Sequence, residues 1–161
     1  MFKITSIAFL LMVLSALNGL AQAETEKPSF GIEIFNLPNN ELGNHVQSIA
    51  QDSFGFIWFG SQYGLHRWDG YKFKTYLNDP LDSNSISSSY VEHIYVARDG
   101  SLWLGTWGGG LNHFDPSTEV FTAYSFDANN PNSLSNNFVS DVIEDQEGNI
   151  WVATQYGINR F

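Results

Sequence analysis

The sequence predicts an all-β fold made of small, repeated antiparallel sheets, and three observations support this prediction. A Gly-x-x-Trp motif occurs three times, and its tryptophans Trp58, Trp103 and Trp151 recur every 45 to 48 residues. Short runs of alternating apolar and polar residues surround each motif, with Gly, Asn, Asp, Ser and Pro between the runs. No apolar pattern with the period of a helix follows residue 23, so strands and turns account for the remaining chain.

The composition is that of a folded chain with no affinity for nucleic acid. Of the 161 residues, 43% are apolar and 16% aromatic, which is more than a disordered polymer carries. Seventeen acidic residues against seven Lys and Arg give a net charge of −10, so nucleic acid is excluded as a partner. The absence of cysteine excludes disulfides, thiolate nucleophiles and cysteine-bound zinc. Packing alone must therefore stabilise the fold.

The first 23 residues predict an export signal. Lys3 precedes an apolar stretch at residues 7–17, and the segment ends in Ala21-Gln22-Ala23, the small-x-small pattern that signal peptidases cleave. An uncleaved anchoring helix is the less favoured alternative, because a membrane span needs about 20 apolar residues. We therefore expect a periplasmic protein in which residues 1–23 are a signal peptide and residues 24–161 form the repeats. A cysteine-free exported chain also suits the bacterial periplasm.

Each repeat contains short strands in the same order. First-strand patterns precede the Gly-x-x-Trp motif, second strands contain its tryptophan, and third strands follow the next glycine and end in an aromatic residue. Fourth strands are expected at residues 73–76 and 121–124. A two-residue hairpin turn is expected at Asp69-Gly70, because glycine tolerates the positive φ of such turns.

The repeat length predicts the blades of a β-propeller. A four-stranded sheet cannot bury both of its faces alone, so such sheets stack around a shared axis. Residues 30–37 stand where a fourth strand would lie, whereas the third repeat stops after its third strand. We therefore expect about three blades, two complete and one split between the termini. Because propellers close with about four to eight blades, we expect part of a larger propeller, with assembly of several copies as the alternative.

These motifs also resemble a known family. The segments QDSFGFIWFGSQYGLHRWDGYKFKTY and SLWLGTWGGGLNHFDPSTEVFTAY, with the linkers SNSIS and PNSLSNNFV, strongly resemble the two-component regulator propeller repeat. The resemblance covers nearly all of residues 31–161. It implies the periplasmic sensor region of a hybrid histidine kinase or diguanylate cyclase, which often detects oligosaccharides. Further blades, a β-sandwich, a membrane span and an output domain complete such proteins, so signalling is expected to need downstream domains that this sequence lacks.

Six residues are candidates for ligand binding. The loops after the second strands carry Tyr63, Trp107 and Tyr156, whose rings can stack on sugars if they are exposed. At equivalent positions of the third strands, side chains can donate hydrogen bonds to hydroxyl or carboxylate groups; these are Arg67, His113 and Arg160. The alternative for Tyr63 and Tyr156 is packing beneath neighbouring blades.

Other repeated residues are assigned structural roles. The three tryptophans are expected to pack between blades, because a recurring large aromatic suits a stacked core. Asp52 and Asp145 are expected to cap the turns that contain the motif glycines. Asp79, Asp82 and Asn84 fit either a calcium site or solvated turns, and turns are favoured.

No catalytic residue, metal or other cofactor is expected. The four histidines lack the spacing of a metal site, and the chain has no Gly-x-Ser-x-Gly elbow. The function predicted is therefore that of a periplasmic, ligand-sensing propeller segment of a bacterial two-component or diguanylate cyclase protein, binding an oligosaccharide or another small ligand. The alternative is a non-catalytic structural propeller that assembles with partners or with itself.

Overall fold

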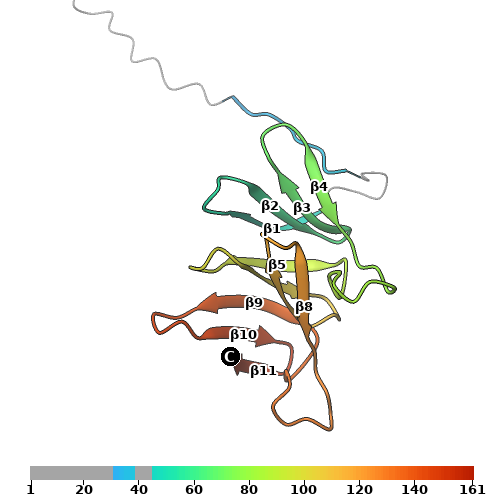
Figure 1. The fold of residues 1–161 in the computed structure, drawn as a ribbon, viewed down its shortest axis with the longest axis vertical. Coiled ribbons are helices and arrows are strands. Elements are labelled where there is room, and N and C mark those ends of the chain that lie inside the picture. Colours follow the sequence, from blue (N-terminus) through green and yellow to red (C-terminus); the bar gives the residue numbers. More distant parts are fainter. Residues whose placement is uncertain (1–30, 39–44) are drawn as a thin grey trace, which may run out of the picture. The chain divides into compact units, whose positions relative to one another are not determined.

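The computed structural model describes residues 31–38 and 45–161, so the predicted signal peptide lies outside the described residues. The chain divides into residues 1–35 and 36–161, and the second unit contains every strand of the described part. Three antiparallel sheets form this unit (Figure 1). The described residues form no helix, and hence none of them belongs to a helix that could cross a membrane.

The sheets follow one another along the chain, each in simple meander order. The first sheet contains β1 (Val46–Gln51), β2 (Ile57–Ser61), β3 (Gly64–Trp68) and β4 (Phe73–Tyr76). The second contains β5 (Val91–Val96), β6 (Leu102–Thr106), β7 (Leu111–Asp115) and β8 (Val120–Tyr124). The third contains β9 (Val139–Glu144), β10 (Ile150–Thr154) and β11 (Gly157–Arg160). We call these sheets blades 1, 2 and 3.

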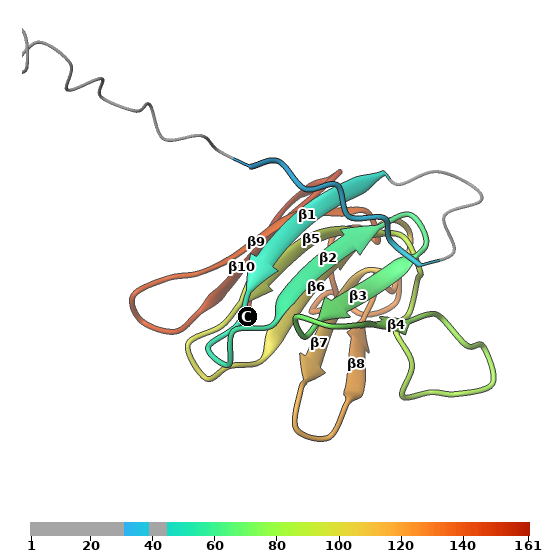
Figure 2. The same cartoon turned by 90° about the horizontal axis from the view of Figure 1, so that it is seen from above.

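The blades stack through their first strands. Strand β5 contacts β1 on one side and β9 on the other, and the three strands lie side by side in Figure 2. Each second strand also contacts the first strand of the following blade, as β2 does with β5 and β6 with β9. The sheets therefore approach each other most closely at their first strands, which is the arrangement of blades around a propeller axis. The predicted fold class is confirmed, as a partial propeller.

The motif glycines form the turns between first and second strands. Gly55, Gly100 and Gly148 have φ of 90°, 87° and 90°, a region that favours glycine. In blade 1 the carboxylate of Asp52 accepts the backbone N–H groups of Phe54 and Phe56. This confirms the predicted capping role of the aspartate, since the carboxylate satisfies donors that the turn leaves unpaired.

The same carboxylate also holds the motif tryptophan, a contact that the sequence analysis did not anticipate. The Trp58 indole N–H donates to Oδ2 of Asp52 over 2.8 Å, and the Trp151 indole donates to Asp145 over the same distance. Ala97 occupies this position in blade 2, where Asp99 instead bonds the backbone and hydroxyl of Ser101. The aspartate thus fixes both the turn and the rotamer of the tryptophan in blades 1 and 3.

Two local predictions were wrong. The β3–β4 hairpin has a four-residue loop, residues 69–72, instead of the two-residue turn at Asp69-Gly70. The Asp69 carboxylate accepts the N–H groups of Tyr71 and Lys72, and this capping favours the longer loop. Residues 31–37 form no strand, because Ile32 and Ile34 are largely exposed where a paired strand would be covered. Within the described residues blade 3 therefore has three strands.

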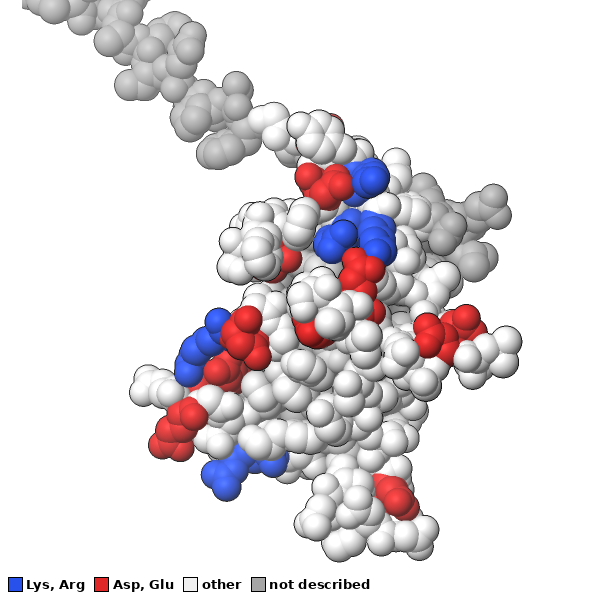
Figure 3. All heavy atoms as spheres, viewed as in Figure 1, with Lys and Arg blue, Asp and Glu red and all other residues white. Residues whose placement is uncertain are grey.

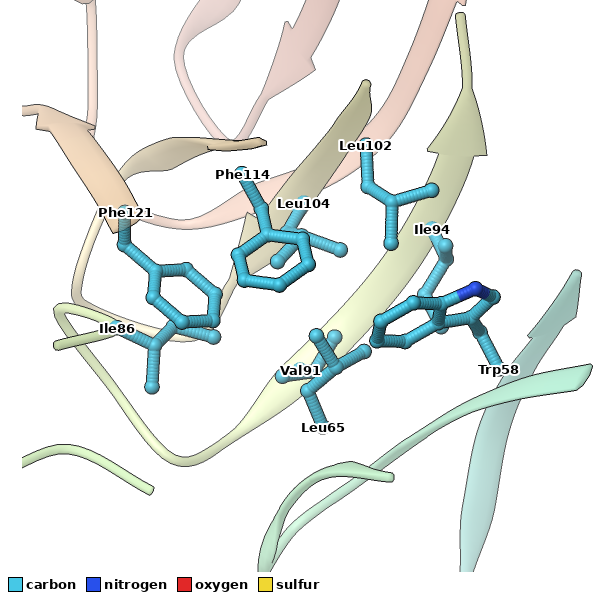
Figure 4. Packing of buried hydrophobic residues seen from close by; sticks show 9 residues of the cluster. All are labelled: Trp58, Leu65, Ile86, Val91, Ile94, Leu102, Leu104, Phe114 and Phe121. Carbon is cyan, nitrogen blue, oxygen red and sulfur yellow. The ribbon is translucent and has the colours of Figure 1, made fainter. Parts of the chain in front are cut away.

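The hydrophobic core lies between the blades. Between blades 1 and 2, the Trp58 ring contacts Phe114 edge-on at 5.5 Å between centroids, and Leu65 lies beside it (Figure 4). Trp103 is packed in the same way against the cluster between blades 2 and 3. The predicted packing role of the tryptophans is therefore confirmed at both interfaces. Full burial of a leucine, isoleucine, valine or phenylalanine side chain in such a cluster contributes about 1.5–3 kcal/mol.

Glycine permits the close approach of successive blades. A Cβ on Gly60 would lie 2.9 Å from a methyl group of Val91 and 3.0 Å from its carbonyl oxygen. A Cβ on Gly105 would meet Val139 at the same separations to within 0.1 Å. Each valine begins the first strand of the next blade, so a second-strand residue without a side chain sets the blade spacing.

Each linker is bonded to the blade that follows it. The side-chain amide of Asn112 on β7 accepts the backbone N–H of Ser87 and donates to its hydroxyl over 2.7 Å. Asn159 on β11 holds Ser135 in the same way. These pairs explain why the Asn-Ser-Ile/Leu-Ser linkers and the third-strand asparagines recur together.

Candidate functional site

The loops after the second strands and the linkers between blades lie on one face, which we call the loop face. The N–H of Trp107 donates to the carbonyl of Tyr90, and the Ser88 hydroxyl donates to the carbonyl of Trp107. The N–H groups of Gly108 and Gly110 both donate to the carbonyl of Asn137. The β6–β7 loop is therefore fixed to the linkers on both sides of blade 2.

Trp107 is the centre of an aromatic cluster on this face. Its ring stacks on Tyr90 at 5.8 Å between centroids and 25° between planes, and it meets Phe138 edge-on at 4.8 Å. The Tyr90 hydroxyl accepts a hydrogen bond from Gln47 of blade 1 over 2.7 Å. Residues of the two linkers thus hold the indole in place, and one of them is bonded to blade 1, yet half of the indole surface is exposed. A rigid, half-exposed indole is a surface on which the apolar face of a sugar ring can stack.

The other two loop aromatics differ from Trp107 in their surroundings. Tyr63 is partly buried in the β2–β3 loop, where its backbone N–H donates to the Ser61 hydroxyl. Tyr156 occupies the β10–β11 loop with its side chain 77% exposed, and its N–H donates to the Thr154 hydroxyl. Both lie at the same ends of their strands as Trp107, as predicted from the repeat.

The third-strand candidates lie toward the opposite strand ends, each paired across the sheet with a motif tryptophan. Arg67 pairs with Trp58, His113 with Trp103, and Arg160 with Trp151. The two guanidinium groups each lie 5.7 Å from the ring of their tryptophan, and the His113 ring is 4.6 Å from that of Trp103. The structure therefore separates these residues from the loop aromatics by most of a strand length, about 10 Å.

Two of the third-strand residues border hollows of the surface. His113 lines a hollow of about 450 Å³ together with Arg98, Asp99 and Asp115. Arg160 lines another of about 330 Å³ with Asn132 and Asn159. Hydrogen bonds from Ser101 and Ser117 lower the pKa values of Asp99 and Asp115, so both carboxylates stay ionised at neutral pH. The six predicted residues thus belong to several places, and the loop face unites only the aromatic ones.

Arg67 belongs to a charged cluster between blades 1 and 2. Glu119, in the β7–β8 turn at a φ of 58°, forms ion pairs with Arg67 at 3.7 Å and with Lys74. It also accepts a hydrogen bond from the Tyr76 hydroxyl. The bond from Lys74 lowers the pKa of Glu119, whereas burial raises the pKa of Tyr76. Figure 3 shows basic side chains directly beside acidic ones, as such pairing between blades produces.

A buried serine–histidine pair has the geometry of a structural contact. Ser61 Oγ lies 3.0 Å from Nε2 of His66, and Nδ1 of His66 lies 2.9 Å from the Thr75 hydroxyl. Both Ser61 and His66 are buried, so no substrate reaches the hydroxyl. Burial lowers the pKa of His66 and keeps its imidazole neutral.

In the described residues no group of three or more His, Cys, Asp and Glu side chains is placed to hold a metal ion.

The sequence analysis missed Tyr90 and Phe138, which position Trp107. Both stand immediately before the first-strand valines Val91 and Val139, where the first repeat has His45. The recurrence of a residue with a ring just before each first strand is the sequence signal that could have identified Tyr90 and Phe138.

The predicted turns in the 79–84 linker are present, since Asp79 and Asp82 each accept a backbone N–H two residues ahead.

The fold and its three repeated sheets define this chain as a segment of a β-propeller. Residues 40–63, 85–108 and 133–156 each match the model of the two component regulator propeller family. The repeats therefore belong to that family, and the resemblance noted in the sequence is confirmed.

Known proteins with similar sequences or folds include signalling proteins. The extracellular domain of the hybrid two component system BT3049 from B. thetaiotaomicron is 31% identical, with a TM-score of 0.68 over 73% of this chain and 17% of that domain. Histidine kinase P4 of Formosa agariphila is 50% identical over 42 residues, which are 26% of this chain and 3% of the kinase. This chain thus spans a small part of either relative.

The fold is also shared with an enzyme. Virginiamycin B lyase from Staphylococcus aureus superposes with a TM-score of 0.57 over 81% of this chain and 45% of the lyase, at 18% identity. At that identity the likeness concerns the arrangement of the blades alone.

Proposed function

We propose that this segment is part of the extracytoplasmic, periplasmic sensor of a bacterial two-component or diguanylate cyclase protein, and that it binds a neutral oligosaccharide on its loop face. The repeats and the extracellular domain of the B. thetaiotaomicron system support the sensor role. The observation that carries the ligand site is the Trp107 cluster, a half-exposed indole fixed by Tyr90 and Phe138 of the two linkers.

The chemistry of the loop face favours a neutral sugar. The chain carries a net charge of −10, which disfavours anionic ligands at long range. Stacking on an aromatic ring uses the C–H face of a sugar and requires no charge, while backbone and hydroxyl groups of the surrounding loops supply hydrogen bonds. The proposal therefore assigns binding to Trp107, with Tyr63 and Tyr156 as neighbouring contacts on the same face.

The third-strand residues take a secondary place in this proposal. Arg67, His113 and Arg160 stack on motif tryptophans, and Arg67 is also paired with Glu119. A ligand that contacts Trp107 would have to extend along a whole strand to reach them. We assign them to stabilising the blades, with ligand contact limited to the two hollows that His113 and Arg160 border.

The test measures binding of neutral oligosaccharides to the purified chain by isothermal titration and by quenching of tryptophan fluorescence. Trp107→Ala is expected to abolish binding while the chain stays folded, with a melting temperature lower by only several degrees because half of the ring is already in water. Tyr71→Ala is the control, because its aromatic ring is 92% exposed in the β3–β4 loop, at the strand ends opposite the loop face. Binding that survives Trp107→Ala, or that Tyr71→Ala abolishes equally, would refute the site.

A further inference from the structure

Glu92 on β5 has a carboxylate oxygen that is buried and unpaired. Among the described residues, no donor lies within hydrogen-bond distance of Oε2 of Glu92, and this atom is shielded from solvent. Buried polar atoms in native proteins are nearly always paired, so an exception needs a physical reason. Glu92 belongs to blade 2, which has a neighbouring blade on each side, so its surroundings are those of the interior of the blade stack.

Glu92 is the extra residue of a β-bulge at the loop-face end of its strand. Val91 pairs with Thr106, the last residue of β6, and the register between the two strands shifts between Val91 and His93. Blade 1 has the same shift, with Gln47 as the extra residue. A bulge changes the direction of a side chain, and bulges are frequent beside functional sites. The bulge therefore places Glu92 beside the linkers and loops of the loop face.

The repeat explains why Glu92 has no partner. At the equivalent position of blade 1, the Gln47 amide donates to the hydroxyl of Tyr90, the residue just before the first strand of the next blade. The residue just before the first strand of blade 3 is Phe138, whose ring has no hydroxyl group. By equivalence, the carboxylate of Glu92 therefore meets a ring that offers no donor. Because Phe138 contacts the Trp107 indole edge-on at 4.8 Å between centroids, the unpaired carboxylate belongs to the aromatic cluster of the loop face.

We propose that Glu92 is a ligand-binding residue, whose carboxylate accepts hydrogen bonds from two adjacent hydroxyl groups of the sugar that stacks on Trp107. This inference rests on the proposed function and narrows its ligand to a neutral sugar with adjacent free hydroxyls. A carboxylate has two acceptor oxygens, and hydrogen bonds to a charged acceptor are about twice as strong as those to a neutral one. Glu92 as a whole is only partly buried, so rotation about its side-chain bonds brings the shielded oxygen to the ligand.

The same carboxylate sets the specificity of the site against acidic sugars. A uronic acid or a sulfated sugar on Trp107 brings a second negative charge close to Glu92, and like charges in a partly desolvated site repel each other. Glutamine has the shape of glutamate without its charge, so Glu92→Gln removes this repulsion together with half of the accepting capacity. The preference for neutral over acidic sugars therefore depends on one side chain.

Isothermal titration of the purified chain with cellotetraose, xylotetraose, mannotetraose and the acidic tetragalacturonate tests the proposal. Glu92→Gln should weaken the binding of a neutral tetrasaccharide about tenfold or more, because charge-assisted hydrogen bonds are lost. The ratio of neutral to acidic affinity should fall further still, since the repulsion of tetragalacturonate is relieved. Glu147→Gln is the matched control, because it changes the net charge equally but lies exposed in the β9–β10 turn, at the strand ends opposite the loop face. It should bind each sugar like the unaltered chain.

The melting temperature of the free chain is a second readout that needs no ligand. A buried oxygen without a partner destabilises the unliganded fold, so Glu92→Gln should leave the melting temperature unchanged or raise it. A clear fall would show that the carboxylate serves the fold, and this result would overturn the proposal.

The binding measurements separate this inference from the proposed function. Binding that Trp107→Ala abolishes but Glu92→Gln leaves unchanged would overturn the role of Glu92 and leave the loop-face site intact. Equal weakening by Glu147→Gln would also overturn it, since a general effect of net charge would then explain the loss. If none of the neutral tetrasaccharides binds the unaltered chain, the proposed function and this inference both fail.

Discussion

Trp58 in blade 1 and Trp151 in blade 3 are the same residue of the same repeat in two environments. Each donates its indole N–H over 2.8 Å to the aspartate six residues before it, and each pairs across the sheet with an arginine. Trp58 is fully buried against blade 2, whereas Trp151 remains 36% exposed.

The comparison separates what one blade supplies from what its neighbour supplies. Turn geometry, indole orientation and cross-strand stacking are identical with and without a following blade, so they arise within the sheet. The desolvation of the apolar face arises between sheets, and it is the larger contribution because area removed from water stabilises by about 25 cal/mol per Å². A blade is therefore locally organised but stabilised mainly by its neighbours.

The largest expected effect is on the two tryptophans themselves. Trp58→Ala should reduce the free energy of unfolding by about 3–5 kcal/mol, because it leaves a cavity between blades 1 and 2. Trp151→Ala should cost about 1 kcal/mol, since part of the ring is already in water. Urea denaturation at neutral pH measures both, with Trp58→Phe as a milder substitute if the alanine variant does not fold. Equal losses at the two positions would contradict the comparison.

The next effect concerns the spacing of the blades. Gly60→Ala should destabilise the chain by about 1–3 kcal/mol, because the added methyl group overlaps Val91 and its carbonyl oxygen. Gly31→Ala is a control, since a Cβ there has no atom within 4 Å. Thermal unfolding followed by circular dichroism provides the measurement. A Gly60→Ala chain as stable as the unaltered one would show that the spacing adjusts freely.

A smaller effect is expected from the aspartate that holds the tryptophan. Asp52→Ala should cost about 1–3 kcal/mol, because the buried indole N–H and two backbone N–H groups lose their acceptor. Asp145→Ala should cost less, because water can reach the exposed Trp151 indole. Comparison of the two urea midpoints decides this point, and a greater loss at Asp145 would contradict it.

The smallest effect is the pH dependence of stability that arises from His66 in blade 1. Burial lowers the pKa of His66 from its ordinary value of 6.5, so the folded chain favours the neutral imidazole. Its contribution to stability is complete above the ordinary pKa and is lost as the pH falls below it toward the folded value. His66→Asn introduces the residue of blades 2 and 3 and should flatten the decline in unfolding free energy between about pH 7.5 and about pH 5. An unchanged slope would exclude His66 as its source.

Sequence alone predicted those features that depend on contacts within a repeat. The period, the strand order, the positive-φ glycines and the packing of the tryptophans all follow from residues that recur at fixed spacing. The four-residue loop at Asp69 could not be read in this way, because the choice between turn lengths depends on which N–H groups the carboxylate reaches.

The candidate site was predicted less well, for a geometric reason. Tyr63 and Arg67 are close in sequence, but an extended strand carries the chain by about 3.3 Å per residue and places them toward opposite ends of blade 1. Trp107 was correctly located on the loop face, whereas its partners Tyr90 and Phe138 come from separate linkers. Contacts between side chains of different repeats do not recur at one fixed separation in the sequence, so the sequence pattern cannot identify them.

The bonds from Asn112 to Ser87 and from Asn159 to Ser135 also determine where the chain divides into modules. Each linker belongs structurally to the sheet that follows it, so a repeat unit begins just after one fourth strand and ends with the next fourth strand. Cuts or insertions aimed at residue 77 or 125 should accordingly spare more structure than those placed immediately before β5 or β9.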